Sequence, residues 1–171
     1  MSKKSWLKIL IVWVLYVLLH FTYKYFPNPV FVLFGCPEET IFQHMKMGFF
    51  SYSLVSIIEY FVLKTKLSVK NFVISRMFSA LVISFFCFII WYIWPLFFGP
   101  IPTEVGEIIY SNIIIILSLI TVVSFEVDVE KSSFSKITTI GITAAWLIAL
   151  CFYVGLSSGE APVLVFELHA H

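Results

Sequence analysis

The sequence predicts an all-α integral membrane protein, and its composition gives the main reasons. Hydrophobic residues make up 60% of the 171-residue chain and charged residues only 12%. Soluble domains are typically about 45–50% apolar and about 25% charged. The formal net charge is only +1, so the chain lacks the basic excess that binds a phosphate backbone. These observations exclude a soluble enzyme and a nucleic-acid-binding protein.

Five apolar segments are each long enough to cross a membrane as a helix, which takes about 20 residues. They are too continuously apolar for the alternating strands of a membrane barrel. Two further segments, 27–38 and 158–171, have apolar stretches too short to cross, and we expect them to be re-entrant or interfacial. We therefore expect one transmembrane domain, 1–171, with spans at about 9–25, 41–63, 77–98, 108–125 and 137–157.

Basic residues predict the orientation of these spans. Nine of the 11 lysines and arginines fall on one side of the expected membrane: Lys3, Lys4, Lys8, Lys64, Lys66, Lys70, Arg76, Lys131 and Lys136. Cytoplasmic loops carry the excess of positive charge. We therefore expect a multi-pass protein of the cell membrane, with its N-terminus in the cytoplasm and its C-terminus outside.

Two similar turns suggest an internal repeat. The second span is preceded by Phe34-Gly35-Cys36-Pro37, and the fourth by Phe98-Gly99-Pro100. Proline near a helix start is common turn chemistry. The pattern therefore fits either a parallel repeat of two helical hairpins or convergence on the same turn.

The second span has the densest set of polar residues. At 100° per residue, Glu39, Gln43 and Lys46 form one stripe. Lys46 is then either a snorkelling lysine neutralised by a carboxylate, or a buried cation that binds an anionic group or carries a proton. His44 lies on an adjoining face, at a depth similar to that of His20 in the first span. These two histidines could ligate a metal or haem, or simply join the helices by hydrogen bonds.

Two more sets of residues add potential metal ligands on the same side. Glu104 and Glu107 open the fourth span, where they are either solvated acids favoured by the helix dipole or oxygen ligands for a divalent cation. His169 and His171 form an H-x-H pair, which suits zinc or copper and also matches the start of a purification tag. On the opposite side, Glu59 and Arg76 are expected to form a structural ion pair.

The stretch from Leu19 to Lys64 resembles a family of small polytopic membrane proteins from bacteria and archaea. That family has L-H-F-x-Y at the end of its first span, N-E-S-x-W-E-H-x-K at the start of its second, and I-E-Y near the inner end of that span. The corresponding segments here are Leu19-His20-Phe21-Thr22-Tyr23, then Glu38-Glu39-Thr40-Ile41-Phe42-Gln43-His44-Met45-Lys46, then Ile58-Glu59-Tyr60. Five polar residues match, while Glu38, Phe42 and Gln43 depart from the pattern. The resemblance supports a site at the matched residues and implies no particular activity.

These observations predict an outward-facing site of histidines and carboxylates that binds a small ligand, with a divalent metal cation as the first expectation. Its ligand-binding residues are expected to be His20, Glu39, His44, Lys46, Glu104 and Glu107, and its metal ligands His20, Glu39 and His44, with His169 and His171 as further candidates. Such a site would serve transport, sensing or a larger membrane complex.

An alternative is a membrane-embedded enzyme acting on a lipid or isoprenoid at the outer leaflet. His44 or Glu39 would then be its acid or base, and Lys46 would hold an anionic head group. A third possibility is an accessory subunit whose polar residues only orient helices. The expected partners are the lipid bilayer and either other membrane subunits or further copies of this chain, with no nucleic acid.

Overall fold

The computed structural model describes residues 1–37, 40–63 and 68–157, and these residues form α-helices joined by short turns. The helices are α1 (Lys3–Tyr25), α2 (Pro29–Phe34), α3 (Ile41–Leu63), α4 (Val69–Phe98), α5 (Glu104–Lys131) and α6 (Lys136–Ser157). No strand occurs in the described ranges.

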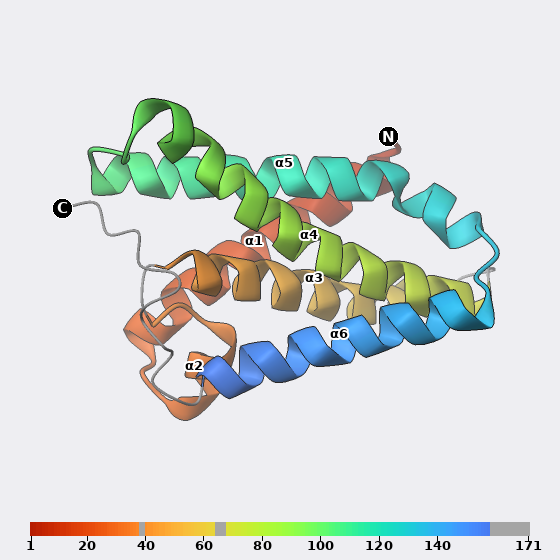
Figure 1. Cartoon of the computed structure of the whole chain (residues 1–171). Coiled ribbons are helices and arrows are strands. Elements are labelled where there is room, and N and C mark those ends of the chain that lie inside the picture. The colour runs from red at the N-terminus through yellow and green to blue at the C-terminus, as the bar shows by residue number, and fades with distance from the viewer. Residues whose placement is uncertain (38–39, 64–67, 158–171) are drawn as a thin grey trace.

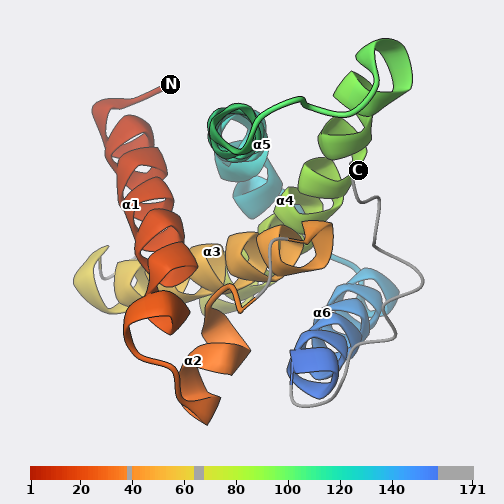
Figure 2. The ribbon, with the colours of Figure 1, turned by 90° about the vertical axis from the view of Figure 1, so that its left-hand side faces the viewer.

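The five long helices alternate in direction, so their ends meet at two opposite ends of the bundle (Figure 1). One end, here called the Lys8 end, contains the starts of α1, α4 and α6 and the final turns of α3 and α5. The opposite end, here called the His44 end, contains the start of α3 and the short helix α2. Figure 2 looks onto the His44 end.

Helix α3 is the central element of the bundle, because it packs against α1, α2 and α4. Gly48 permits a close approach to its neighbours. A Cβ atom at this position would lie 3.3 Å from the Ile83 side chain of α4 and 3.5 Å from that of Ile115 in α5. Side chains around this point have no exposed surface, including Val12, Met47, Phe49, Ile83, Ile115 and Leu119.

Within the described residues, four helices are long and apolar enough to cross a membrane: α1, α4, α5 and α6. They are compatible with a multi-pass membrane protein. Helix α3 has 23 residues, as many as α1, but it carries Gln43, His44, Lys46 and Glu59. These four side chains interrupt its apolar sequence.

The observed helices extend the expected spans in a consistent way. Helix α3 has the expected bounds, whereas α4 begins at Val69 and α5 continues to Lys131. Both extensions lie at the Lys8 end, where Glu126 and Glu130 are buried rather than exposed. Because these two carboxylates are ion-paired, α5 continues as a helix beyond its apolar segment.

The segment 27–38, expected to be re-entrant or interfacial, contains α2. Asn28 caps this helix by accepting hydrogen bonds from the backbone N–H groups of Val30 and Phe31, and Pro29 occupies its first turn, as helix starts favour. The second such segment, 158–171, lies outside the described residues.

The two turns that suggested a repeat have different backbones. Gly99 ends α4 with φ of 76°, a conformation that glycine adopts without strain. Gly35 ends α2 with φ of −94°. A Cβ at Gly35 would lie 2.7 Å from the Phe31 carbonyl oxygen and 3.0 Å from that of Leu19, so here glycine lets α2 pack against the α1 backbone.

Candidate functional site

The structure brings His20 of α1 and His44 of α3 together. Their rings stack with centroids 5.7 Å apart and planes 15° apart. His44 is buried, and its Nδ1 shares a hydrogen bond of 2.7 Å with the Tyr16 hydroxyl. Helix α1 therefore places two polar side chains, those of Tyr16 and His20, against the His44 imidazole. The two residues are one helical turn apart.

Helix α4 closes the other side of His44. The Trp91 ring stacks on the imidazole with a centroid separation of 5.2 Å. Pro95 lies one turn beyond Trp91 and has no N–H to donate to the carbonyl four residues earlier. The Tyr110 hydroxyl of α5 donates to the backbone carbonyl of Ile90, and it accepts a hydrogen bond from the Trp94 N–H at 3.2 Å. Helix α5 thus supports α4 where proline interrupts its hydrogen bonding.

A cleft of about 440 Å³ lies between α1 and α5, next to the histidine pair. Its polar groups are Tyr16, His20, Ser111 and Asn112, and the remaining lining residues are aromatic or aliphatic. Asn112 joins the two walls, because its Oδ1 accepts a hydrogen bond of 2.9 Å from the Trp13 indole N–H. We call this feature the histidine cleft.

Lys46 lies on a different face of α3 from the histidine cleft. Its side chain is fully buried. The ammonium donates to the Val32 carbonyl of α2 at 2.8 Å and to the Ser157 hydroxyl of α6 at 3.1 Å. Among the described residues, the lysine therefore holds α2 and α6 rather than contacting His20 or His44.

The predicted carboxylate ligands have less defined surroundings. Glu107 is half-buried; its backbone N–H donates to the Thr103 carbonyl at 3.0 Å, but its carboxylate makes no hydrogen bond or ion pair with the described part of the chain. Glu104 begins α5, but its side chain is outside the description, as are Glu39, His169 and His171. Of the predicted site, the described residues therefore place His20 next to His44, but they do not place any of the predicted carboxylate ligands beside the two histidines.

The histidine pair is not arranged as a preformed metal site. Nitrogen lone pairs lie in the ring plane, so two nearly parallel stacked rings do not direct them at one point. Zinc bonds of about 2.0–2.1 Å to both rings would require at least one ring to turn. No group of three or more His, Cys, Asp or Glu side chains in the described ranges is placed to hold a metal ion.

A second polar centre, at the Lys8 end, was only partly predicted. The expected pair is present, with the Arg76 Nη2 3.0 Å from a Glu59 carboxylate oxygen. The Lys8 ammonium lies 2.7 Å from Glu59 and 2.7 Å from Glu126. Arg76 also lies 3.4 Å from Glu126 and 2.9 Å from Glu130. We call these five residues, from four helices, the Lys8 cluster.

Sequence reasoning missed three members of this cluster, although a signal for them was present. Glu126 and Glu130 are spaced i, i+4, so they share one face of a helix. Lys8 lies at the matching depth of the first span, where it was interpreted only as a cytoplasmic marker. Charged residues at the same membrane depth on several spans would have indicated that their side chains form ion pairs with one another.

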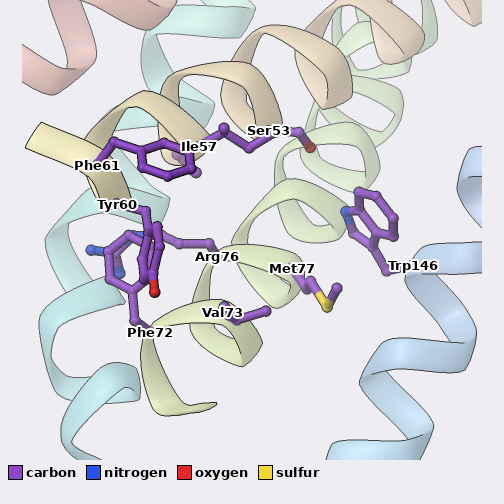
Figure 3. Close-up of a pocket in the computed structure, with 10 residues that line it drawn as sticks. Ser53, Ile57, Tyr60, Phe61, Phe72, Val73, Arg76, Met77 and Trp146 are labelled. Atoms are coloured by element: carbon purple, nitrogen blue, oxygen red, sulfur yellow. The ribbon is translucent and has the colours of Figure 1, made fainter. Parts of the chain in front are cut away.

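The Lys8 end also has an apolar groove between α3, α4 and α6, with a volume of about 370 Å³. Figure 3 shows Trp146 of α6 across the groove from Val73 and Met77 of α4, with Ser53 and Ile57 on α3. Among the described residues that line this groove, only Arg76 is charged, and its guanidinium is ion-paired with Glu59 and Glu130 of the Lys8 cluster. Hydrocarbon surface of this kind suits lipid chains.

Comparison with known proteins adds no relative: no family model, no curated protein and no solved structure matches this chain.

Proposed function

We propose that this chain is a five-span membrane protein that binds a small amphipathic ligand, of the lipid or isoprenoid class, in the histidine cleft. The observation that carries the proposal is a cleft of about 440 Å³ with polar groups from two helices on otherwise apolar walls. Ligand sites typically have volumes of about 300–1,000 Å³ and a few polar groups on mainly apolar walls.

The proposal counts α3 as a span in addition to the four apolar helices, which gives five spans. Helix α3 fits this role because it is antiparallel to α1 and α4 and packs between them. The positive-inside rule then directs the Lys8 end to the cytoplasm and the His44 end outward. In this orientation the cleft lies toward the outer leaflet.

Apolar residues around the cleft support entry from the bilayer. Phe21, Ile109 and Ile113 line it and are 40%, 56% and 48% exposed. In a membrane such surfaces face lipid tails. A molecule that diffuses in the outer leaflet could therefore enter between α1 and α5, with its polar group toward Tyr16 and His20. This is the ligand class of the lipid-acting enzyme considered above, and no reaction is assigned to it.

The test is to identify what the purified protein retains. Native mass spectrometry of the protein released from detergent should show a bound amphiphile, which lipid extraction then identifies. Ser111→Phe places a ring in the cleft and should remove that mass. Ser124→Phe is the matched control, because Ser124 is exposed on the same helix and does not line the cleft. Equal retention by the two variants would refute the proposal.

A divalent metal is the second candidate, favoured by the contact between the His20 and His44 rings. This site requires a ring to turn from its stacked orientation. Elemental analysis should then find about one metal per chain in the wild type and none in His44→Phe. A metal-free wild type after growth with added zinc would rule this candidate out.

A further inference from the structure

The Lys8 cluster has an uncompensated charge. Its two cations, Lys8 and Arg76, face three carboxylates, and all five side chains are at most 15% exposed. No other Lys, Arg or His of the described residues forms an ion pair with these carboxylates. Among the described residues, one negative charge is therefore in excess in a region of low solvent access, where an unpaired charge is costly.

The excess charge lies on α5. Glu59 is bound by Arg76 through two hydrogen bonds, of 3.0 and 3.1 Å, and also by Lys8. Glu130 has a single ion pair, through one oxygen, with Arg76. Its neighbour Glu126 carries a like charge at i−4, an unfavourable spacing. Glu130 is also in the last turn of α5, where the helix dipole favours a cation over an anion.

Two buried hydroxyls lie on the helices that carry Glu59 and Arg76. The Tyr52 ring lies under the Lys8 ammonium, 4.6 Å from ring centroid to Nζ. Ser79 is three residues after Arg76 on α4, hence on the same side of that helix. Both side chains are fully buried, and their hydroxyls have no hydrogen-bond partner among the described residues. Such groups normally have a partner, so this end of the bundle buries polar groups that the described residues do not satisfy.

We propose that the Lys8 cluster binds one monovalent cation, either a proton or an alkali-metal ion, at the Glu126 and Glu130 carboxylates. Carboxylate oxygens suit a hard cation, and one positive charge balances the five residues of the cluster. The groups that face this position are Lys8 of α1, Tyr52 and Glu59 of α3, Arg76 of α4 and the two glutamates of α5. This site is separate from the histidine cleft and does not depend on the ligand proposed there.

The test measures thermal unfolding of the full chain in detergent while the cation is varied. NaCl or KCl replaces choline chloride at constant ionic strength, and a second series varies pH in choline chloride alone. An alkali cation that binds only the folded state raises the melting temperature by about 3–6 °C for each tenfold increase above its Kd. A proton instead makes the wild type more stable at lower pH, with this stabilisation lost as pH rises, and leaves the sodium series flat.

Two glutamine or asparagine variants assign the response. Glu130→Gln removes the excess charge and should abolish the sodium or pH response. Asp128→Asn is the control, because Asp128 lies between the two glutamates on α5 and its side chain is 81% exposed. It should respond as the wild type does. The proposal is overturned if Glu130→Gln retains the wild-type response, or if the wild type responds to neither series.

Wild-type protein gives a second measurement if Glu130→Gln does not fold. Calorimetric titration with NaCl against choline chloride reports alkali-ion binding, and infrared spectra report the carbonyl band of a protonated carboxyl group. One of the two signals is expected. Absence of both would overturn the proposal.

Discussion

The two ends of this bundle bury polar side chains in different ways. At the Lys8 end, charged groups from four helices form a network of ion pairs of 2.7–3.4 Å. At the His44 end, polar rings stack and share a hydrogen bond beside a cleft of about 440 Å³. Buried ions tolerate few arrangements because each needs a counter-charge. Uncharged polar rings need no counter-charge, so they can line an open cleft. The His44 end therefore suits an amphipathic ligand, whereas the Lys8 end suits a small cation.

The largest expected effect is at the Lys8 end. Arg76→Leu removes the cation that contacts three carboxylates, two of them buried, and should lower the free energy of unfolding by about 3–5 kcal/mol. Expression yield and thermal unfolding in detergent measure this loss. Lys70→Leu, on the same helix, is the control, because Lys70 is exposed and donates only to the Phe134 carbonyl. It should change stability by no more than about 0.5 kcal/mol. Similar losses in both variants would show that the cluster does not hold this end together.

A smaller effect is expected from the polar rings at the His44 end. His44→Phe keeps a ring beside Trp91 but removes the 2.7 Å hydrogen bond between His44 and the Tyr16 hydroxyl, which should cost about 1–3 kcal/mol. Tyr16→Phe removes the same hydrogen bond from the other side. Because both variants delete one interaction, the double variant should cost less than the sum of the single ones. Additive losses in a thermal-unfolding cycle would mean that the two groups are not coupled.

Two glycines sharpen the comparison further. Gly35→Ala places a methyl group against the carbonyl oxygens of Phe31 and Leu19, and overpacking of this kind costs about 1–3 kcal/mol. Gly141→Ala on α6 meets no atom within 4 Å and replaces a helical glycine, so it should be neutral or stabilising by up to about 1 kcal/mol. Melting temperatures of the two variants should therefore move in different directions or by clearly different amounts. Equal shifts would contradict the tight packing of α2 on α1.

Sequence patterns predicted the helical membrane-protein class and the Glu59–Arg76 pair, because both follow from composition and from charges near span ends. They did not predict that Lys46 holds α2 and α6. Helical periodicity locates a side chain on its own helix but does not say which neighbour covers that face. The histidine cleft could not be predicted from the sequence either, because its volume depends on the distance between α1 and α5. The five-span count, the orientation and the ligand stay predictions.

The Lys46 contacts impose an order on how the chain matures during synthesis. The Val32 carbonyl precedes Lys46 by 14 residues, whereas the Ser157 hydroxyl follows it by 111. At about 5–20 residues per second, the ribosome needs roughly 6–22 s to reach Ser157 after making Lys46. Of the two described acceptors, only the Val32 carbonyl of α2 exists during that interval, so this six-residue helix can bind the ammonium before α6 is made. A nascent chain halted before α6 would therefore depend on α2 far more than the finished protein does.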